Sequence, residues 1–194
     1  MLLNKVGRNL VICRNFTTKS TFKTCHLVNR SVVRIQGKES ADFLQGLMTN
    51  DINHLTENHE NPAIFAMFLN TQGRVMFDTF ITKPNIENDE EFYIDCDKDL
   101  SEKLVKHLKM YKVRRKLTIE IQENDHVMAV FHPEKNLDNI NRDSGEKCKI
   151  SFSDTRAKEL GIREISSDCS ADTDLRYVCY DSLIFLSLQY TLSM

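Results

Sequence analysis

The sequence lacks an apolar run long enough to cross a membrane. A spanning helix needs roughly 18 consecutive apolar residues, and no such stretch occurs. The longest apolar stretch near the end, at residues 183–188 (LIFLSL), is much shorter. We therefore expect no membrane span. With 194 residues, 41% hydrophobic and 28% charged, the chain is long enough for one globular domain with an apolar core.

The six cysteines lack any C-x-x-C pair, which removes the spacing typical of zinc ribbons and ferredoxins. We therefore predict no metal site formed by this chain alone. Scattered free thiols, with Cys96 packed as a small hydrophobe, are one interpretation. The other is that folding brings three cysteines together in space. The cysteines are Cys13, Cys25, Cys96, Cys148, Cys169 and Cys179.

The first 38 residues lack acidic side chains, and Glu39 is the first acid of the chain. Eight of the 26 basic residues lie in this stretch, so 18 basic residues face 28 acidic ones in the remainder. A basic, acid-free start with apolar residues at helical spacing is typical of a mitochondrial transit peptide. We predict a leader at residues 1–27, processed between Phe16 and Val28, and a location in the mitochondrial matrix.

The alternative for this segment is a disordered basic tail that binds acidic surfaces. If the leader is removed, the mature chain is acidic. Net acidity argues against binding to nucleic acid, because phosphate binding depends on basic side chains.

Hydrophobic periodicity predicts a strand, a helix, several strands, a second helix and further strands, which is an α+β class. We expect an antiparallel or mixed sheet with helices on one face. Asp99 and Glu102 are expected to cap the second helix. The expected strands are 31–35, 63–69, 74–82, 91–96, 117–122 and 127–131, with a strand and turn at 149–165; the helices are 40–48 and about 99–111, and 133–149 is an exposed loop.

Three blocks of sequence resemble one known superfamily. They are residues 44–52 (LQGLMTNDI), 68–78 (FLNTQGRVMFD) and 109–116 (KMYKVRRK). Together they are similar to the folate-binding superfamily of the glycine-cleavage T-protein and YgfZ. Two later segments, 154–156 (DTR) and 160–163 (LGIR), resemble the Asp-Pro-Arg and Leu-Gly-Trp-Arg patterns of that superfamily, with Thr155 and Ile162 as departures.

The resemblance covers residues 28–177, and it is strongest to the mitochondrial iron–sulfur cluster assembly branch of the superfamily. It implies the N-terminal part of the T-protein fold and a role in maturing four-iron cluster proteins, namely aconitase-like, radical-SAM and lipoate-synthesis enzymes. It also implies A-type iron–sulfur scaffold proteins as partners, tetrahydrofolate as a ligand, and a cluster shared only transiently with a partner.

The resemblance ends after Leu175-Arg176-Tyr177. The superfamily continues to a cysteine motif of the form Lys-Gly-Cys-Tyr-x-Gly-Gln-Glu, whereas residues 178–194 form a divergent hydrophobic tail here. We expect a C-terminally truncated product that retains the fold but is impaired in sharing a cluster; the alternative is a natural short paralogue.

The first candidate binding group lies where the first helix ends: Gln45, Thr49, Asn50 and Asp51. Amide, hydroxyl and carboxylate groups could bind a pterin or another polar heterocycle. The alternative is that they cap the helix and shape a turn.

The second group is Asn70, Arg74 and Asp78, around a turn at Gly73. Arg74 and Asp78 are four apart on a strand and share a face, so they could present a cation and a carboxylate to a ligand. The alternative is an ion pair on the sheet surface, which contributes little to stability.

The third group is a basic cluster at the end of the second helix, together with Tyr111. It could bind the glutamate tail of a folate or dock an acidic partner; the alternative is a solvated helix end stabilised by the helix dipole. Few aromatic residues are interleaved, which weakens an RNA-binding interpretation. The cations are Lys106, Lys109, Lys112, Arg114, Arg115 and Lys116, of which Arg114 joins the predicted folate site.

The competing function is a folate-dependent aminomethyl or one-carbon transferase. Phe77 stands where the resemblance places the first acid of a double-Asp pattern, and no general base is identifiable. We therefore favour a non-catalytic assembly factor and predict no catalytic residue.

Overall fold

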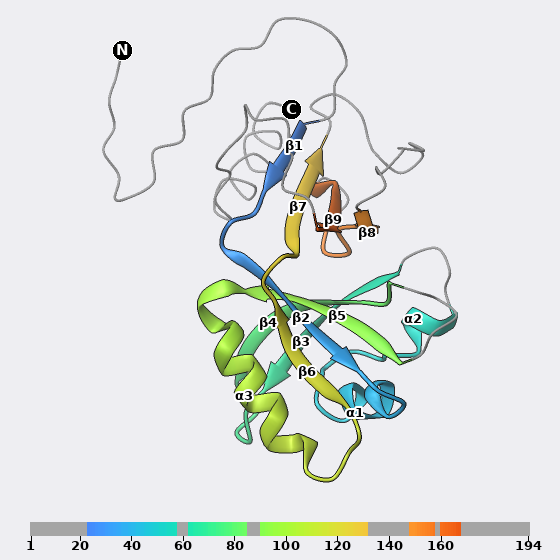
Figure 1. The fold of residues 1–194 in the computed structure, drawn as a ribbon, viewed down its shortest axis with the longest axis vertical. Coiled ribbons are helices and arrows are strands. Elements are labelled where there is room, and N and C mark those ends of the chain that lie inside the picture. The colour runs from blue at the N-terminus through green and yellow to red at the C-terminus, as the bar shows by residue number, and fades with distance from the viewer. Residues whose placement is uncertain (1–22, 58–61, 85–89, 132–147, 158–159, 168–194) are drawn as a thin grey trace, which may run out of the picture.

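The computed structural model describes residues 23–57, 62–84, 90–131, 148–157 and 160–167, which form two antiparallel sheets (Figure 1). One sheet has the order β3-β4-β5-β2-β6 and the other β1-β7-β9-β8. The strands are β1 (Lys23–His26), β2 (Arg30–Gln36), β3 (Ala63–Leu69), β4 (Val75–Thr82), β5 (Glu91–Asp97), β6 (Thr118–Gln122), β7 (His126–Phe131), β8 (Cys148–Ser153) and β9 (Ile162–Ser166). The helices are α1 (Ser40–Gln45), α2 (His54–Glu57), the short 3-10 helix η1 (Lys98–Leu100) and α3 (Ser101–Lys112).

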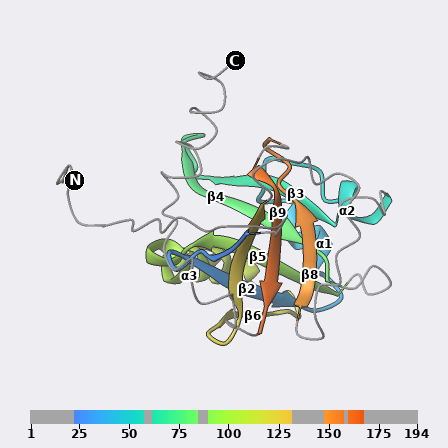
Figure 2. The same cartoon turned by 90° about the horizontal axis from the view of Figure 1, so that it is seen from above.

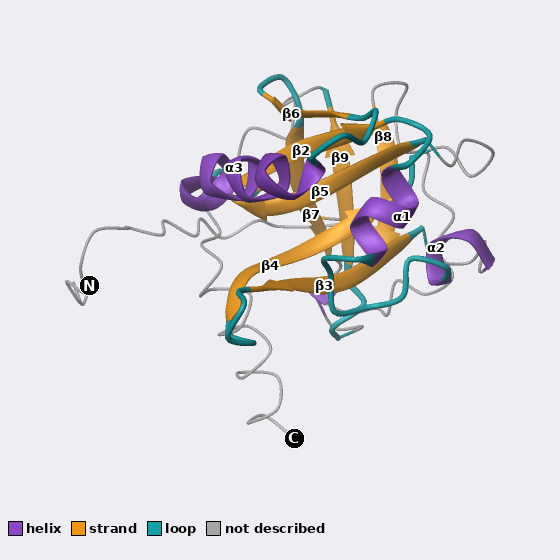
Figure 3. Cartoon of the chain, turned by 90° about the horizontal axis from the view of Figure 1, so that it is seen from below, coloured by secondary structure: helices purple, strands orange, loops and turns teal. Residues whose placement is uncertain are grey.

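The helices α1 and α3 cover one face of the five-stranded sheet (Figure 3). Leu104 and Leu108 lie one turn apart on α3 and are fully buried. They pack with Phe43 and Leu44 of α1 in a core that also contains alternate residues of the strands beneath. This layer confirms the predicted α+β class, with helices on one face of an antiparallel sheet.

The four-stranded sheet lies across the opposite face of the five-stranded sheet (Figure 2). Because side chains alternate along a strand, Val32 and Tyr93 point to this side and pack against Leu27, Val127 and Ile165. The sequence analysis expected one sheet. The structure has two, because β7 pairs with β1 and β9, and β9 pairs with β8, instead of extending the first sheet.

The first helix is shorter than the predicted 40–48. It ends at Gln45, and the next residues run along the edge of β3 instead. Met48 forms a bridge with Phe68, and the Thr49 N–H donates to the carbonyl of Met67 at 3.0 Å. The Met48 N–H still donates to the carbonyl of Leu44 at 3.1 Å, whereas Thr49 pairs with the strand edge instead of continuing the helix.

The predicted cap of the second helix is wrong. Asp97, not Asp99, accepts a backbone hydrogen bond, from the Asp99 N–H at 2.8 Å, and it begins η1. The helix α3 follows without a side-chain cap.

Strand β1 lies inside the range 1–27 that the sequence analysis assigned to a leader. It pairs with β7, and Cys25 is fully buried between the sheets. The folded unit therefore extends back to residue 23. The structure does not describe residues 1–22, the tail 178–194, or residues 133–147 of the predicted loop. The last two residues of that loop, 148 and 149, begin β8. Within the described ranges, no helix is long and apolar enough to span a membrane.

Candidate functional site

Two of the predicted binding side chains tie the turn after α1 into the fold. The Gln45 side-chain oxygen accepts a hydrogen bond from the backbone N–H of Ile52 at 2.7 Å. The Thr49 hydroxyl accepts one from the backbone N–H of Met67 at 3.0 Å, beside the bond that Thr49 itself donates. Both side chains satisfy backbone donors, as the turn-forming alternative proposed.

Asn50 and Asp51 act in the same way. Asn50 donates from its amide to the carbonyl of Phe65 at 3.0 Å and accepts from the N–H of Asp51 at 2.8 Å. Asp51 accepts from the N–H of Asn53 at 2.9 Å. The turn is therefore rigidly attached to the edge of β3, and its polar groups already make structural contacts.

Asn70 organises the turn between β3 and β4. Its side-chain oxygen accepts from the N–H groups of Gln72 and Arg74, both at 2.9 Å. Gly73 has a positive φ of 77°, which favours glycine. The Arg74 side chain is exposed, and within the described part of the chain no ion pair joins it to Asp78. The predicted surface ion pair is therefore not formed.

Asp78 of β4, Met67 of β3 and Thr49 of the turn after α1 lie side by side across three adjacent segments. Asp78 is directly opposite Met67 in the pairing of β4 with β3, and Met67 is bonded on its other side to Thr49. Asp78 is half-buried. Alternation places its side chain on the face of the sheet opposite to that of Phe77.

Tyr111 lies on that other face. Its ring is 4.9 Å from the ring of His107, which in turn is 5.8 Å from the ring of Phe77. Arg114 follows the helix and is exposed. The structure therefore brings Thr49 and Asp78 into one row but places Tyr111 on the helix-covered face, so the predicted binding residues do not converge on one face.

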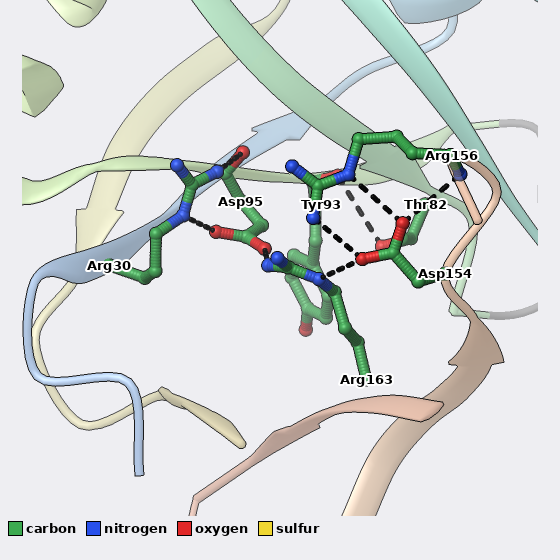
Figure 4. Close-up of polar contacts among 7 residues, drawn as sticks. All are labelled: Arg30, Thr82, Tyr93, Asp95, Asp154, Arg156 and Arg163. Carbon is green, nitrogen blue, oxygen red and sulfur yellow. Dashed lines mark hydrogen bonds and ion pairs between the residues drawn. The ribbon is translucent and has the colours of Figure 1, made fainter. Parts of the chain in front are cut away.

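A buried chain of charges joins the two sheets (Figure 4). Asp95 on β5 accepts from Arg30 on β2 at 2.6 Å and from Arg163 on β9 at 2.7 Å. Arg163 also donates to Asp154 at 3.0 Å, and Asp154 accepts from Arg156 at 2.7 Å. We call these five residues the inter-sheet charge network.

The network is almost completely desolvated. The side chains of Arg30, Asp95, Arg163 and Asp154 are at most 3% exposed, and only Arg156, at 25%, reaches solvent. Buried charges are tolerated only when they are paired, and here arginines and aspartates alternate.

Asp154 shows the balance of these effects. Burial opposes its ionisation, but the hydrogen bonds from Arg156 and the positive charge of Arg163 outweigh burial and hold the pKa of Asp154 below its ordinary value. Asp154 is therefore ionised at neutral pH and accepts hydrogen bonds from both arginines.

The exposed end of the network provides a candidate binding surface. The Arg156 guanidinium lies 4.8 Å from the ring centre of Phe80 and 5.7 Å from that of Phe65. Asp78 is two residues before Phe80 and shares its face of β4. Phe80 is fully buried, so the accessible groups here are the Arg156 guanidinium, the partly buried ring of Phe65 and the half-buried carboxylate of Asp78. These groups suit a planar polar ligand with an anionic group.

The sequence analysis did not assign Arg156, Arg163 or Asp154 to a site. The signal was present, because these residues belong to the two short patterns at 154–156 and 160–163. Their partners, Arg30 and Asp95, had no sequence signal, since only the fold brings residues 65 and 68 positions apart into contact.

The described cysteines do not form a metal site. Cys25 and Cys96 are buried, Cys148 is half-buried, and no group of three potential ligands occurs among the described residues. Burial and the charge of Asp95 raise the pKa of Cys96 to about 12, so it remains a thiol. This agrees with the predicted small-hydrophobe role of Cys96, because metal binding requires a thiolate.

Comparisons with known proteins give one consistent group. No model of a known protein family matches the chain. "Iron-sulfur cluster assembly factor IBA57, mitochondrial" from Mus musculus is 33% identical over 155 residues, covering 75% of this chain and 43% of the relative. The IBA57 homolog from Coccidioides immitis is 36% identical over 149 residues, which cover 71% of this chain and 35% of that protein. The IBA57 protein from Homo sapiens is 29% identical over 160 residues, which cover 78% of this chain and 45% of that protein.

Among solved structures, glycine cleavage system aminomethyltransferase T from Bartonella henselae has a TM-score of 0.48 and 12% identity, over 58% of this chain and 29% of that one. The chain spans less than half the length of the curated relatives described above. Because relatives at 33% and 36% identity match more than two thirds of it, the chain belongs to the family of the mitochondrial iron–sulfur cluster assembly factor IBA57.

Proposed function

We propose that this chain acts in the mitochondrial matrix as an iron–sulfur cluster assembly factor for four-iron cluster proteins. The observation that carries the proposal is the 33% identity over 155 residues to a protein named for that function. The basic, acid-free start of the sequence supports the mitochondrial location.

The cluster is cargo in this proposal, and a partner supplies its ligands. Two of the three described cysteines are buried, and the pKa of Cys96 is raised to about 12. These thiols are poorly suited to receive iron. We infer that an A-type scaffold protein carries the cluster and that this chain binds the scaffold.

We also propose that the surface formed by Arg156, Phe65 and Asp78 binds tetrahydrofolate. The aromatic ring and the carboxylate suit stacking and hydrogen bonding with a pterin, and the guanidinium suits the carboxylates of a glutamate tail. Aminomethyl transfer is not proposed, since Phe77 is 4% exposed and packs against His107, so this position supplies no carboxylate.

The cluster test uses the full chain, a purified A-type scaffold loaded with a [2Fe–2S] cluster, a reductant and apo-aconitase. The expected result is faster recovery of aconitase activity when the chain is added. Recovery at the same rate with and without the chain would overturn the proposed function.

The folate test is independent of the cluster test. Titration of the chain with tetrahydrofolate is expected to give saturable binding that Asp78→Asn weakens about tenfold, the size of one lost hydrogen bond to a charged group. Asp99→Asn removes an exposed carboxylate elsewhere and is the matched control. Equal affinities for both variants would contradict the placement of the ligand.

A further inference from the structure

Exposed large apolar side chains are concentrated at one end of α3. Six occur among the described residues, and three of them lie in the last turn of α3 or at the residue that ends it. We call these three the apolar face: Met110, Tyr111 and Val113. Scattered single apolar residues are ordinary on a protein surface, whereas a concentration of this kind marks an interaction site.

Ring contacts join this face to the core. Tyr111 lies one helical turn after His107, and the two rings are 4.9 Å apart. The His107 ring in turn contacts the buried ring of Phe77 on β4. Met110 is three residues from His107 and lies on the same side of the helix. The exposed side chains of the face therefore lie beside buried rings at the end of α3.

One exposed residue of the face, Val113, has a strained backbone conformation. Val113, the residue that ends α3, has a φ of 47° and is 81% exposed. A positive φ is unfavourable for a β-branched residue, and glycine would adopt it freely. No burial of the side chain offsets this strain, and strained residues of this kind concentrate at functional sites.

The surroundings of the face carry charge of almost one sign. Residues 101–116, which comprise α3 and the segment after it, contain seven basic side chains and a single acidic one, Glu102. Lys106 lies one turn before Met110 on the same side of the helix. A partner that covers the apolar side chains must therefore present carboxylates around its own apolar centre.

We propose that the apolar face docks an acidic protein surface: apolar side chains of the partner cover Met110, Tyr111 and Val113, and its carboxylates meet the surrounding lysines. A second copy of this chain is a poorer occupant, because two basic rims would face each other. The inference stands whether or not the chain serves cluster assembly, since it rests only on exposure, contacts and charge.

The test places the photoreactive amino acid p-benzoylphenylalanine at Met110 of the full chain and irradiates intact mitochondria that contain it. Val28, 48% exposed on the turn between β1 and β2, is the matched control position. The expected result is a crosslink from position 110 to one protein with an acidic surface, and none from position 28. Crosslinks to a second copy, to lipid or to nucleic acid, or the absence of any crosslink at 110, would overturn the proposal.

The crosslinked protein is then purified and titrated against variants of the full chain. We expect Met110→Ser and Lys106→Gln each to weaken binding about tenfold, whereas Val28→Ser and Lys98→Gln, at and beside the turn between β1 and β2, leave it unchanged. We expect 0.5 M salt to weaken binding by a further factor of about ten. Binding that is insensitive to both the Met110 and the Lys106 changes would refute the assignment of this face.

Val113→Gly separates docking from folding. Because glycine relieves the positive φ, the thermal midpoint is expected to rise while the affinity for the partner falls several-fold. A variant with both a higher midpoint and an unchanged affinity would show that Val113 is not displayed for docking.

Discussion

Asp95→Asn is expected to destabilise the fold strongly. Asp95 is fully buried and neutralises two guanidinium groups, of Arg30 and Arg163, at 2.6 and 2.7 Å. At an effective dielectric constant of about 20, each contact is worth about 5 kcal/mol before desolvation. Removing one partner from a buried ion pair costs about 3–5 kcal/mol, because the remaining charge stays desolvated. That loss is a large part of the roughly 5–15 kcal/mol that stabilises a typical domain.

The measurement is urea unfolding of the full chain followed by circular dichroism. Glu91→Gln is the control. Glu91 and Arg34 form an ion pair at the same 2.6 Å as Asp95 and Arg30, but the Glu91 side chain is 19% exposed and that of Arg34 is 31% exposed. We expect about 0–1 kcal/mol for that change. Adding Arg163→Met to Asp95→Asn should recover part of the loss, since it removes one of the three cations that would otherwise share the single carboxylate of Asp154. A loss below about 1 kcal/mol for Asp95→Asn, equal to that of the control, would refute the reasoning.

Three further predictions concern other parts of the molecule. Gly37→Ala should destabilise the fold by about 2 kcal/mol or more in urea unfolding, because the φ of Gly37 is 147° and the new Cβ would lie 2.4 Å from the Lys116 carbonyl oxygen. Gly46→Ala is the control: the nearest atom to its new Cβ is 3.7 Å away, so the unfolding free energy should change little. Burial lowers the pKa of both His26 and His107 below 6.5, so the folded state disfavours protonation, and the unfolding free energy should fall as the pH drops from 7.5 through 6.5. The fall in unfolding free energy should be smaller in the variant that combines His26→Asn with His107→Asn. The same pH dependence in this variant and in the unmodified chain would contradict the prediction. In the native protein, iodoacetamide should label Cys148 faster than Cys96, because Cys96 is buried and its pKa is raised to about 12. Mass spectrometry of digested samples taken at successive times measures the two labelling rates. Equal rates would contradict the burial of Cys96.

The strands that could be predicted from the sequence are those with strong local patterns. Ala63–Leu69 is apolar almost throughout and matches β3 at both ends. The end of the first helix could not be predicted, because Met48 and Thr49 leave it for contacts with a strand some 20 positions later. Strand β1 was missed for a similar reason: its basic composition predicts a leader, and only its pairing with β7 identifies it as a strand.

The candidate site was predictable only in part. The turn residues Thr49 and Asn50 were found by their chemistry, but the local sequence could not show that their side chains bond to β3. The inter-sheet charge network depends on four segments that meet only after both sheets form. Charged residues in strands are ordinarily read as solvent-facing, and so Arg30 and Asp95 gave no signal.

The central strands β2 and β5 bury side chains on both faces, with Val33 and Ile94 in the core beneath the helices and Val32 and Tyr93 in the core between the sheets. Neither core can therefore open while the other stays intact. We infer that the described residues unfold as one cooperative unit, with a single transition by every spectroscopic probe. The slowest amide exchange should be shared by β2, β5 and their neighbours in both sheets, with no boundary between the sheets at which the chain could be cut into two independently folding halves.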